Sequence, residues 1–233
     1  MKIAILQCGE VSKESESQAG CNSEMIKAMF DVTEGFFEFE SFDCQDGCYP
    51  DDIDDYDFYI TSGSKAGVYE DKVWIQRLIK FVRQLDNKKK KLIGICFGHQ
   101  IMAMACDGMV EKSENGWGVG VAVNRVVSNP EWMSEKRAAL NLPVSHQDQI
   151  ITVPEDAQII AESDFCPFFM VQWNDHFLST QGHPEWNREY SEIILARSKG
   201  TIPNQLFQSA LSSLHIKSDN TLFKRWIMDF VRS

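Results

Sequence analysis

Hydrophobic residues follow two different periods along this chain, and the two periods alternate. Short apolar or alternating runs, which are typical of strands, occupy residues 2–7, 36–42, 57–60, 91–95 and 177–181. Apolar residues three and four positions apart, which are typical of amphipathic helices, occupy residues 22–30, 69–85 and a segment that begins at His99. This alternation predicts an α/β fold with an open, mostly parallel sheet and helices on both of its faces.

The pattern changes in the second half of the chain. Residues 109–127 and 157–180 are rich in β-branched and aromatic side chains, which predicts strands and hairpins at an antiparallel edge of the sheet. Closing helices are predicted over residues 189–198, 204–214 and 222–231. We therefore expect a three-layer, flavodoxin-like or Rossmann-like domain over residues 1–200. Residues 201–233 are expected to form a helical extension packed on the same domain.

One candidate site is the junction between the strand at residues 91–95 and the helix that follows it. The sequence Gly94-Ile95-Cys96-Phe97-Gly98 has the layout of a nucleophile elbow, in which a sharp turn presents one reactive side chain. A thiolate at this point would be stabilised by the helix N-terminus, and the same amides could hold an oxyanion. Taken alone, the motif fits a buried structural cysteine equally well, because free cysteines are commonly buried.

A second motif, Gln181-Gly182-His183-Pro184-Glu185, follows the strand at residues 177–181. Pro184 restricts the residue before it, so His183 is expected in an extended loop conformation. Glu185 lies close enough in sequence to accept a hydrogen bond from the imidazole. Cys96, His183 and Glu185 together supply a nucleophile, a base and a group that orients the base, which favours a thiol hydrolase.

These motifs resemble those of the class I glutamine amidotransferases that use a Cys-His-Glu triad. Two further stretches agree: Thr61-Ser62-Gly63-Ser64 stands where the family has a Gly-Gly-Pro-like loop, and Ser145-His146-Gln147-Asp148 is similar to an element near the glutamine site. The resemblance covers residues 1–190. It is greatest to stand-alone members related to the amidotransferase half of GMP synthetase and to the plant γ-glutamyl peptidases.

The resemblance implies a role for each matching residue. Cys96, His183 and Glu185 would form the catalytic triad, and the backbone amides of Gly63 and Phe97 would form the oxyanion hole. The substrate-binding residues implied by the resemblance are Gln100, Ser145 and His146, of which His146 could equally have a packing role. Ser62 and Ser64 depart from the family loop. No cofactor and no metal are expected, since Cys44 and Cys48 lack partners that would complete a zinc site.

Charge and composition limit the partners. The net charge of −11 argues against nucleic acid and anionic membranes as binding partners, because both attract basic surfaces. No run approaches the roughly 20 apolar residues of a membrane span, and the apolar run at residues 2–7 is too short for a secretory signal. Seven cysteines without framework spacing are expected to be free thiols, which predicts a cytoplasmic protein.

Three functions remain open from the sequence. The first is a stand-alone amidotransferase-like hydrolase that cleaves the γ-amide of glutamine through a Cys96 γ-glutamyl thioester and delivers ammonia to a partner protein. The second is a γ-glutamyl peptidase that acts on a small γ-glutamyl peptide or conjugate. The third is a catalytically silent binding protein of the same fold. Loops at residues 9–20 and 63–69 are expected to set specificity.

Overall fold

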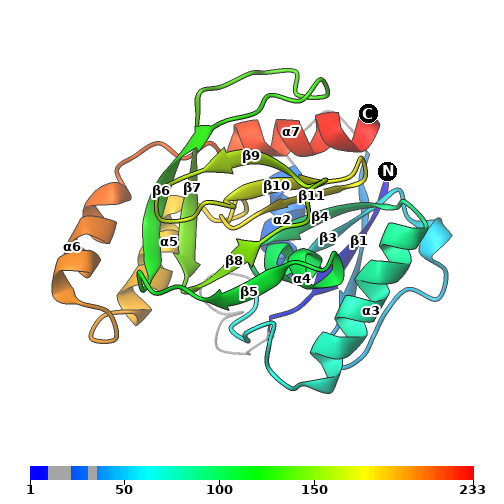
Figure 1. Cartoon of the computed structure of the whole chain (residues 1–233), viewed down its shortest axis with the longest axis horizontal. Coiled ribbons are helices and arrows are strands. Elements are labelled where there is room, and N and C mark those ends of the chain that lie inside the picture. The colour runs from blue at the N-terminus through cyan, green and yellow to red at the C-terminus, as the bar shows by residue number, and fades with distance from the viewer. Residues whose placement is uncertain (10–21, 31–35) are drawn as a thin grey trace.

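The computed structural model describes residues 1–9, 22–30 and 36–233 (Figure 1). Apart from Gly9, the predicted specificity loop at residues 9–20 lies outside the described residues. The helices are α2 (Asn22–Phe30), η1 (Ile53–Asp55, a 3-10 turn), α3 (Val73–Asn87), α4 (Phe97–Ala105), α5 (Arg188–Arg197), α6 (Asn204–Ser213) and α7 (Asn220–Arg232). The strands are β1 (Lys2–Gln7), β2 (Glu38–Asp43), β3 (Phe58–Thr61), β4 (Lys91–Ile95), β5 (Met109–Lys112), β6 (Gly118–Val126), β7 (Ala139–His146), β8 (Asp148–Thr152), β9 (Gln158–Glu162), β10 (Met170–Trp173) and β11 (Phe177–Thr180).

The central sheet of the described chain has nine strands in the order β2-β1-β3-β4-β11-β10-β9-β6-β7. The strands from β2 to β11 run parallel, and those from β11 to β7 are antiparallel to their neighbours. The predicted α/β class, with a parallel sheet and an antiparallel segment, is therefore confirmed. β5 and β8 form a separate two-stranded sheet.

The position of β11 within the sheet matters for function. The sequence pattern placed residues 157–180 at the sheet's edge, but β11 lies inside the sheet and pairs in parallel with β4, Thr180 opposite Ile95. The backbone N–H of Cys96 donates to the carbonyl oxygen of Thr180 at 2.9 Å. Because parallel strands end at the same edge, the residues that follow β4 and β11 come together there.

Helices cover both faces because successive strand residues point to opposite sides. In β1, Ile3 and Ile5 pack in the cluster that contains α2 and α7, whereas Ala4 and Leu6 pack in the cluster that contains α3 and α4. Figure 1 shows α3 and α7 on opposite sides of the sheet. Trp226 of α7 is fully buried in the cluster that contains Ile3 and Ile5, so part of the C-terminal segment covers that face of the sheet.

Two predicted boundaries were wrong, and two strands were missed. The helix predicted over residues 69–85 begins at Val73, because Gly67 and Glu70 form a turn in which the Gly67 N–H donates to the Glu70 carboxylate. The strand predicted from residue 36 begins at Glu38. No strand was predicted at residues 139–152, where β7 and β8 lie.

No helix in the described ranges is long and apolar enough to cross a membrane.

Candidate active site

Cys96 lies in a strained turn between β4 and α4. Its backbone has φ of 51° and ψ of −98°, a left-handed φ that residues other than glycine rarely adopt. The neighbouring glycines make the turn possible: a Cβ atom on Gly98 would lie 1.5 Å from Thr61 Oγ1, and one on Gly94 would lie 3.0 Å from the Gly98 carbonyl carbon. The strand-to-helix turn expected at Cys96 is therefore present, and close packing against β3 holds it.

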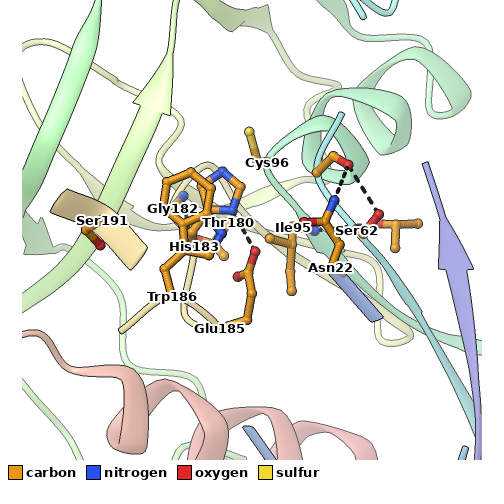
Figure 2. A network of polar contacts seen from close by, with 12 residues as sticks. Asn22, Ser62, Ile95, Cys96, Thr180, Gly182, His183, Glu185, Trp186 and Ser191 are labelled. Carbon is orange, nitrogen blue, oxygen red and sulfur yellow. Dashed lines mark hydrogen bonds and ion pairs between the residues drawn. The ribbon is translucent and has the colours of Figure 1, made fainter. Parts of the chain in front are cut away.

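His183 and Glu185 form a buried pair in the loop after β11. His183 Nδ1 lies 2.7 Å from Glu185 Oε1, and the two side chains are only 4% and 2% exposed. The backbone N–H of His183 donates to the Pro143 carbonyl oxygen at 2.8 Å, which fixes the loop against β7. Figure 2 shows the carboxylate below the ring, with the contact drawn as a dashed line.

The imidazole of His183 lies beside the cysteine turn. A Cβ atom on Gly63 would lie 2.9 Å from His183 Cε1 and 3.8 Å from Cys96 Cβ, so the three residues meet at one point. Burial of His183 opposes its charged form, but the negative charges of Glu185 and Cys96 outweigh burial and raise its pKa from 6.5 to about 10. Protonated His183 therefore stabilises the fold fully below about pH 6.5, and this contribution is lost as pH rises through about 10.

Trp186 stacks on His183, a contact that the sequence did not predict. The ring centroids are 3.6 Å apart and the planes are within 9°. An aromatic face against an imidazolium favours the charged form and fixes the ring's orientation. In Figure 2 the stacked rings lie on one side of Cys96, and Asn22 and Ser62 lie on the other. The only sequence signal was an aromatic residue directly after His-Pro-Glu.

Gln181 is a second residue that the sequence did not single out. It is fully buried, and its Nε2 donates to Cys96 Sγ at 3.5 Å. Its Oε1 accepts a hydrogen bond of 3.0 Å from Gln100 Nε2, which also donates to the Asp148 carbonyl oxygen at 2.9 Å. Gln100, expected to place the substrate, thus holds Gln181 against the cysteine.

The candidate oxyanion groups, Gly63 and Phe97, both lie next to Cys96. The Gly63 carbonyl oxygen accepts from Asn22 Nδ2 at 3.4 Å and from Ser62 Oγ at 3.2 Å, which fixes this peptide group. Ser62 Oγ also accepts from the Cys8 N–H at 2.9 Å, so the serine that replaces a family glycine ties the loop to β1. Phe97 begins α4, where a backbone N–H has no acceptor within its own helix.

Ser145 and His146 lie at the end of β7. Burial, assisted by the charge of His183, lowers the pKa of His146 to about 4, although Nδ1 lies within hydrogen-bonding distance of the Asp148 carbonyl oxygen at 3.1 Å. His146 is therefore neutral near pH 7. Ser145 lines, with Trp186, a cavity of about 10 Å³, which is room for a single water molecule. Both residues thus border the His183 side of the site.

The described residues contain no group of three or more His, Cys, Asp or Glu side chains arranged to hold a metal ion.

Replacing Glu185 by glutamine is expected to lower the pKa of His183 by at least about one unit, because it removes an opposite charge and leaves the burial. The nitrogen shifts of the His183 ring, followed by NMR between about pH 5 and 11, would measure this. Glu189→Gln is the matched control, since Glu189 is exposed on the next helix. Equal titration midpoints in the wild type and the Glu185 variant would show that the carboxylate does not govern the imidazole.

Comparison with known proteins places this architecture in a family. The family described as "Glutamine amidotransferase class-I" matches residues 45–195, more than half of the chain. The chain therefore belongs to the class I glutamine amidotransferase family, as its motifs predicted.

Two relatives and one solved structure show which members of the family this chain is similar to. Gamma-glutamyl peptidase 3 of Arabidopsis thaliana is 34% identical over 196 residues, which cover 77% of this chain and 79% of the relative. A glutamine-hydrolyzing GMP synthase subunit of Archaeoglobus fulgidus is 32% identical over 123 residues, 48% of this chain and 65% of the relative. The solved glutamine amido transferase of Methylobacillus flagellatus superposes with a TM-score of 0.76 at 19% identity, covering 99% of this chain and 92% of that one, which shows a shared fold.

Proposed function

We propose that this protein hydrolyses the γ-amide bond of a small γ-glutamyl compound, with Cys96, His183 and Glu185 as its catalytic triad. The observation that carries the proposal is the buried imidazole of His183, held at 2.7 Å by Glu185 and placed beside the strained turn of Cys96. Family membership and the peptidase relatives support a hydrolase. A nucleophile, a base and an orienting carboxylate are the groups that such a reaction needs.

The chemistry follows in two halves. The Cys96 thiolate attacks the γ-carbonyl carbon, and the backbone N–H groups of Gly63 and Phe97 hold the oxyanion, where one donor is worth roughly 3 kcal/mol. His183, protonated, gives its proton to the leaving nitrogen as the C–N bond breaks, leaving a γ-glutamyl thioester. A water molecule then loses a proton to His183 and attacks the thioester. Glutamate leaves, and Cys96 is a thiolate beside an imidazolium again.

Gln181 and Trp186 assist this cycle in the proposed mechanism. The amide of Gln181 donates to the sulfur and stabilises its anion, while Trp186 holds the imidazole in one plane. Neither side chain reacts. Both keep Cys96 and His183 in the charged pair that the first step uses.

The leaving group distinguishes a γ-glutamyl peptidase from an amidotransferase-like hydrolase that delivers ammonia. Similarity to a gamma-glutamyl peptidase over more than three quarters of both chains favours an amino acid or peptide as the leaving group and water as the acceptor. Similarity to the GMP synthase subunit covers a smaller share of this chain, and it supports the reading in which glutamine is cleaved and ammonia passes to a partner protein. We favour the peptidase reading on this difference in coverage.

The purified chain, assayed alone, is expected to release glutamate and a free amine from a γ-glutamyl dipeptide at least about tenfold faster, in kcat/KM, than ammonia from glutamine. An α-glutamyl dipeptide of the same composition is the matched control and should not be cleaved. Faster cleavage of glutamine than of the dipeptide would contradict the peptidase proposal and favour a hydrolase that delivers ammonia to a partner protein. Failure to cleave any of the three, with Cys96 unreactive toward iodoacetamide, would favour the silent binding protein.

A further inference from the structure

The backbone at Gly63 lies beside both reacting side chains of the proposed triad. A Cβ atom on Gly63 would lie 2.9 Å from His183 Cε1 and 3.8 Å from Cys96 Cβ, so a side chain at this position would displace the imidazole. Glycine is also the residue with the greatest backbone freedom. An oxyanion donor works only when it is aimed at one place before the reaction begins. The N–H of Gly63 therefore needs neighbouring residues that restrain this glycine.

Ser62 provides the first restraint. The residue is fully buried, and its hydroxyl accepts from the backbone N–H of Cys8 at 2.9 Å and donates to the Gly63 carbonyl oxygen at 3.2 Å. Its own backbone N–H donates to the Leu6 carbonyl oxygen at 3.1 Å. Leu6 lies in β1, a strand inside the sheet. One serine thus fixes the backbone before Gly63 and the carbonyl group after it.

Asn22 provides a second restraint from a different element, α2. Its Nδ2 donates to the same Gly63 carbonyl oxygen at 3.4 Å, so both lone pairs of this oxygen have a donor. A Cβ atom on Gly9 would lie 2.5 Å from Asn22 Nδ2 and 3.0 Å from the Gly63 oxygen. The lack of a side chain at Gly9 therefore leaves room for this contact. Figure 2 shows Asn22 and Ser62 beside the cysteine turn, with the contacts drawn as dashed lines.

The peptide group of Cys8, which anchors Ser62, is fixed in turn. Its carbonyl oxygen accepts from Gln45 Nε2 at 2.7 Å, and the Gln45 backbone N–H donates to Asp43 Oδ1 at 2.9 Å at the end of β2. Hydrogen bonds thus run from β2 through Cys8 and Ser62 to Gly63. Hydrogen bonds in such a chain polarise one another. Ser62 is therefore the link between the ends of two strands and the proposed oxyanion donor.

We infer that Ser62 and Asn22 are positioning residues that hold the N–H of Gly63 toward the developing oxyanion, an inference that rests on the proposed function. Neither side chain touches the substrate in this mechanism. An interaction that forms only in the transition state changes kcat and kcat/KM by the same factor and leaves KM unchanged. A loosened Gly63 therefore slows formation of the thioester without weakening substrate binding.

Ser62→Ala is the first test, because it removes both contacts of the hydroxyl. We expect kcat for the γ-glutamyl dipeptide to fall at least about tenfold, with KM within about twofold of the wild type. Alkylation of Cys96 by iodoacetamide should keep its rate, since displacement at a saturated carbon forms no oxyanion. Asn22→Ala leaves the Cys8 N–H paired and should lower kcat at least about threefold, again without a change in KM.

Ser213→Ala is the matched control, because Ser213 makes the same pair of contacts in α6, which holds no residue of the proposed site. Its hydroxyl accepts from the Val121 N–H at 2.9 Å and donates to the Ala210 carbonyl oxygen at 2.6 Å. Removing it should lower the free energy of unfolding, as Ser62→Ala does, but leave kcat and KM unchanged. Urea unfolding of the variants separates this loss of stability from the loss of rate.

Three results would overturn the inference: kcat in Ser62→Ala within about twofold of the wild type, an equal fall of kcat in Ser213→Ala, or a matching fall in the rate of Cys96 alkylation. Failure of the proposed function gives a different result, in which the wild type itself cleaves no γ-glutamyl compound. The restraint is then tested by ¹⁵N relaxation of the Gly63 amide. A lower order parameter in Ser62→Ala than in the wild type would support the restraint, and equal values would refute it.

Discussion

Cys96→Ala is expected to reduce hydrolysis of a γ-glutamyl dipeptide by about 10⁴-fold or more, while the chain stays folded. The thiolate is the only group of the protein that forms a covalent bond to the substrate in the proposed mechanism. Without it, His183 can at best activate water at a site shaped for a thioester. Loss of one buried sulfur beside the strained turn costs far less in stability than in rate. Steady-state kinetics and circular dichroism on the same preparation would measure both.

Cys106→Ala is the matched control for this experiment, because Cys106 lies at the other end of the same helix. Burial and the nearby Asp86 raise the pKa of its thiol to about 12, so it stays protonated near neutral pH. We expect its removal to leave both kcat and the alkylation of Cys96 by iodoacetamide unchanged. Residual turnover above about 1% in Cys96→Ala, with Cys106→Ala impaired, would place the nucleophile elsewhere.

Gly98→Ala is expected to give the largest loss of stability of any single methyl addition in the elbow, about 3 kcal/mol or more. The new Cβ would lie 1.5 Å from Thr61 Oγ1 and 2.5 Å from Thr61 Cβ. At these distances either α4 or β3 must move. Thr61 cannot easily yield, because it is fully buried and its Oγ1 accepts from the Ile95 N–H at 3.3 Å. Urea unfolding followed by fluorescence would measure the change.

A second variant can show whether the loss of stability in Gly98→Ala comes from the contact with Thr61 or from a general effect of alanine on the helix. Thr61→Gly removes all three Thr61 atoms that the alanine methyl group would meet, so the double variant should recover part of the stability lost by Gly98→Ala. A double-mutant cycle would express this recovery as a favourable interaction energy of about 1 kcal/mol or more. Additive losses in the two single variants would show that contact with β3 is not what requires glycine here.

The correct predictions rest on signals that are local in the sequence. The turn at Cys96 is specified by two glycines within two residues of it, and the His183–Glu185 pair by a proline between the two residues. The strands and helices of the parallel half follow from the period of their apolar residues. Each of these signals acts over a few residues, so none needs knowledge of the fold.

Two of the differences from prediction also involve contacts that are distant in sequence. The segment before α3 reads as helix, yet Tyr69 donates to Asp148 at 3.1 Å, 79 residues away, and the helix does not begin until Val73. β7 has Pro143 within it and few signals of its own, but it pairs with β6 along its length. Strand pairing stabilised by a partner elsewhere in the chain leaves a weak trace in the strand's own sequence.

The sequence by itself determined the candidate chemistry of this protein: a cysteine on a strand-to-helix turn, a histidine beside a carboxylate, and the family that combines them. Only the tertiary structure decided how these groups meet. The insertion of β11 beside β4 brings His183 to Cys96, and the same packing buries Gln181 against the sulfur and Trp186 against the imidazole. Motifs follow from short-range backbone sterics, whereas pairing and burial depend on contacts between segments far apart in the chain, which no local pattern records.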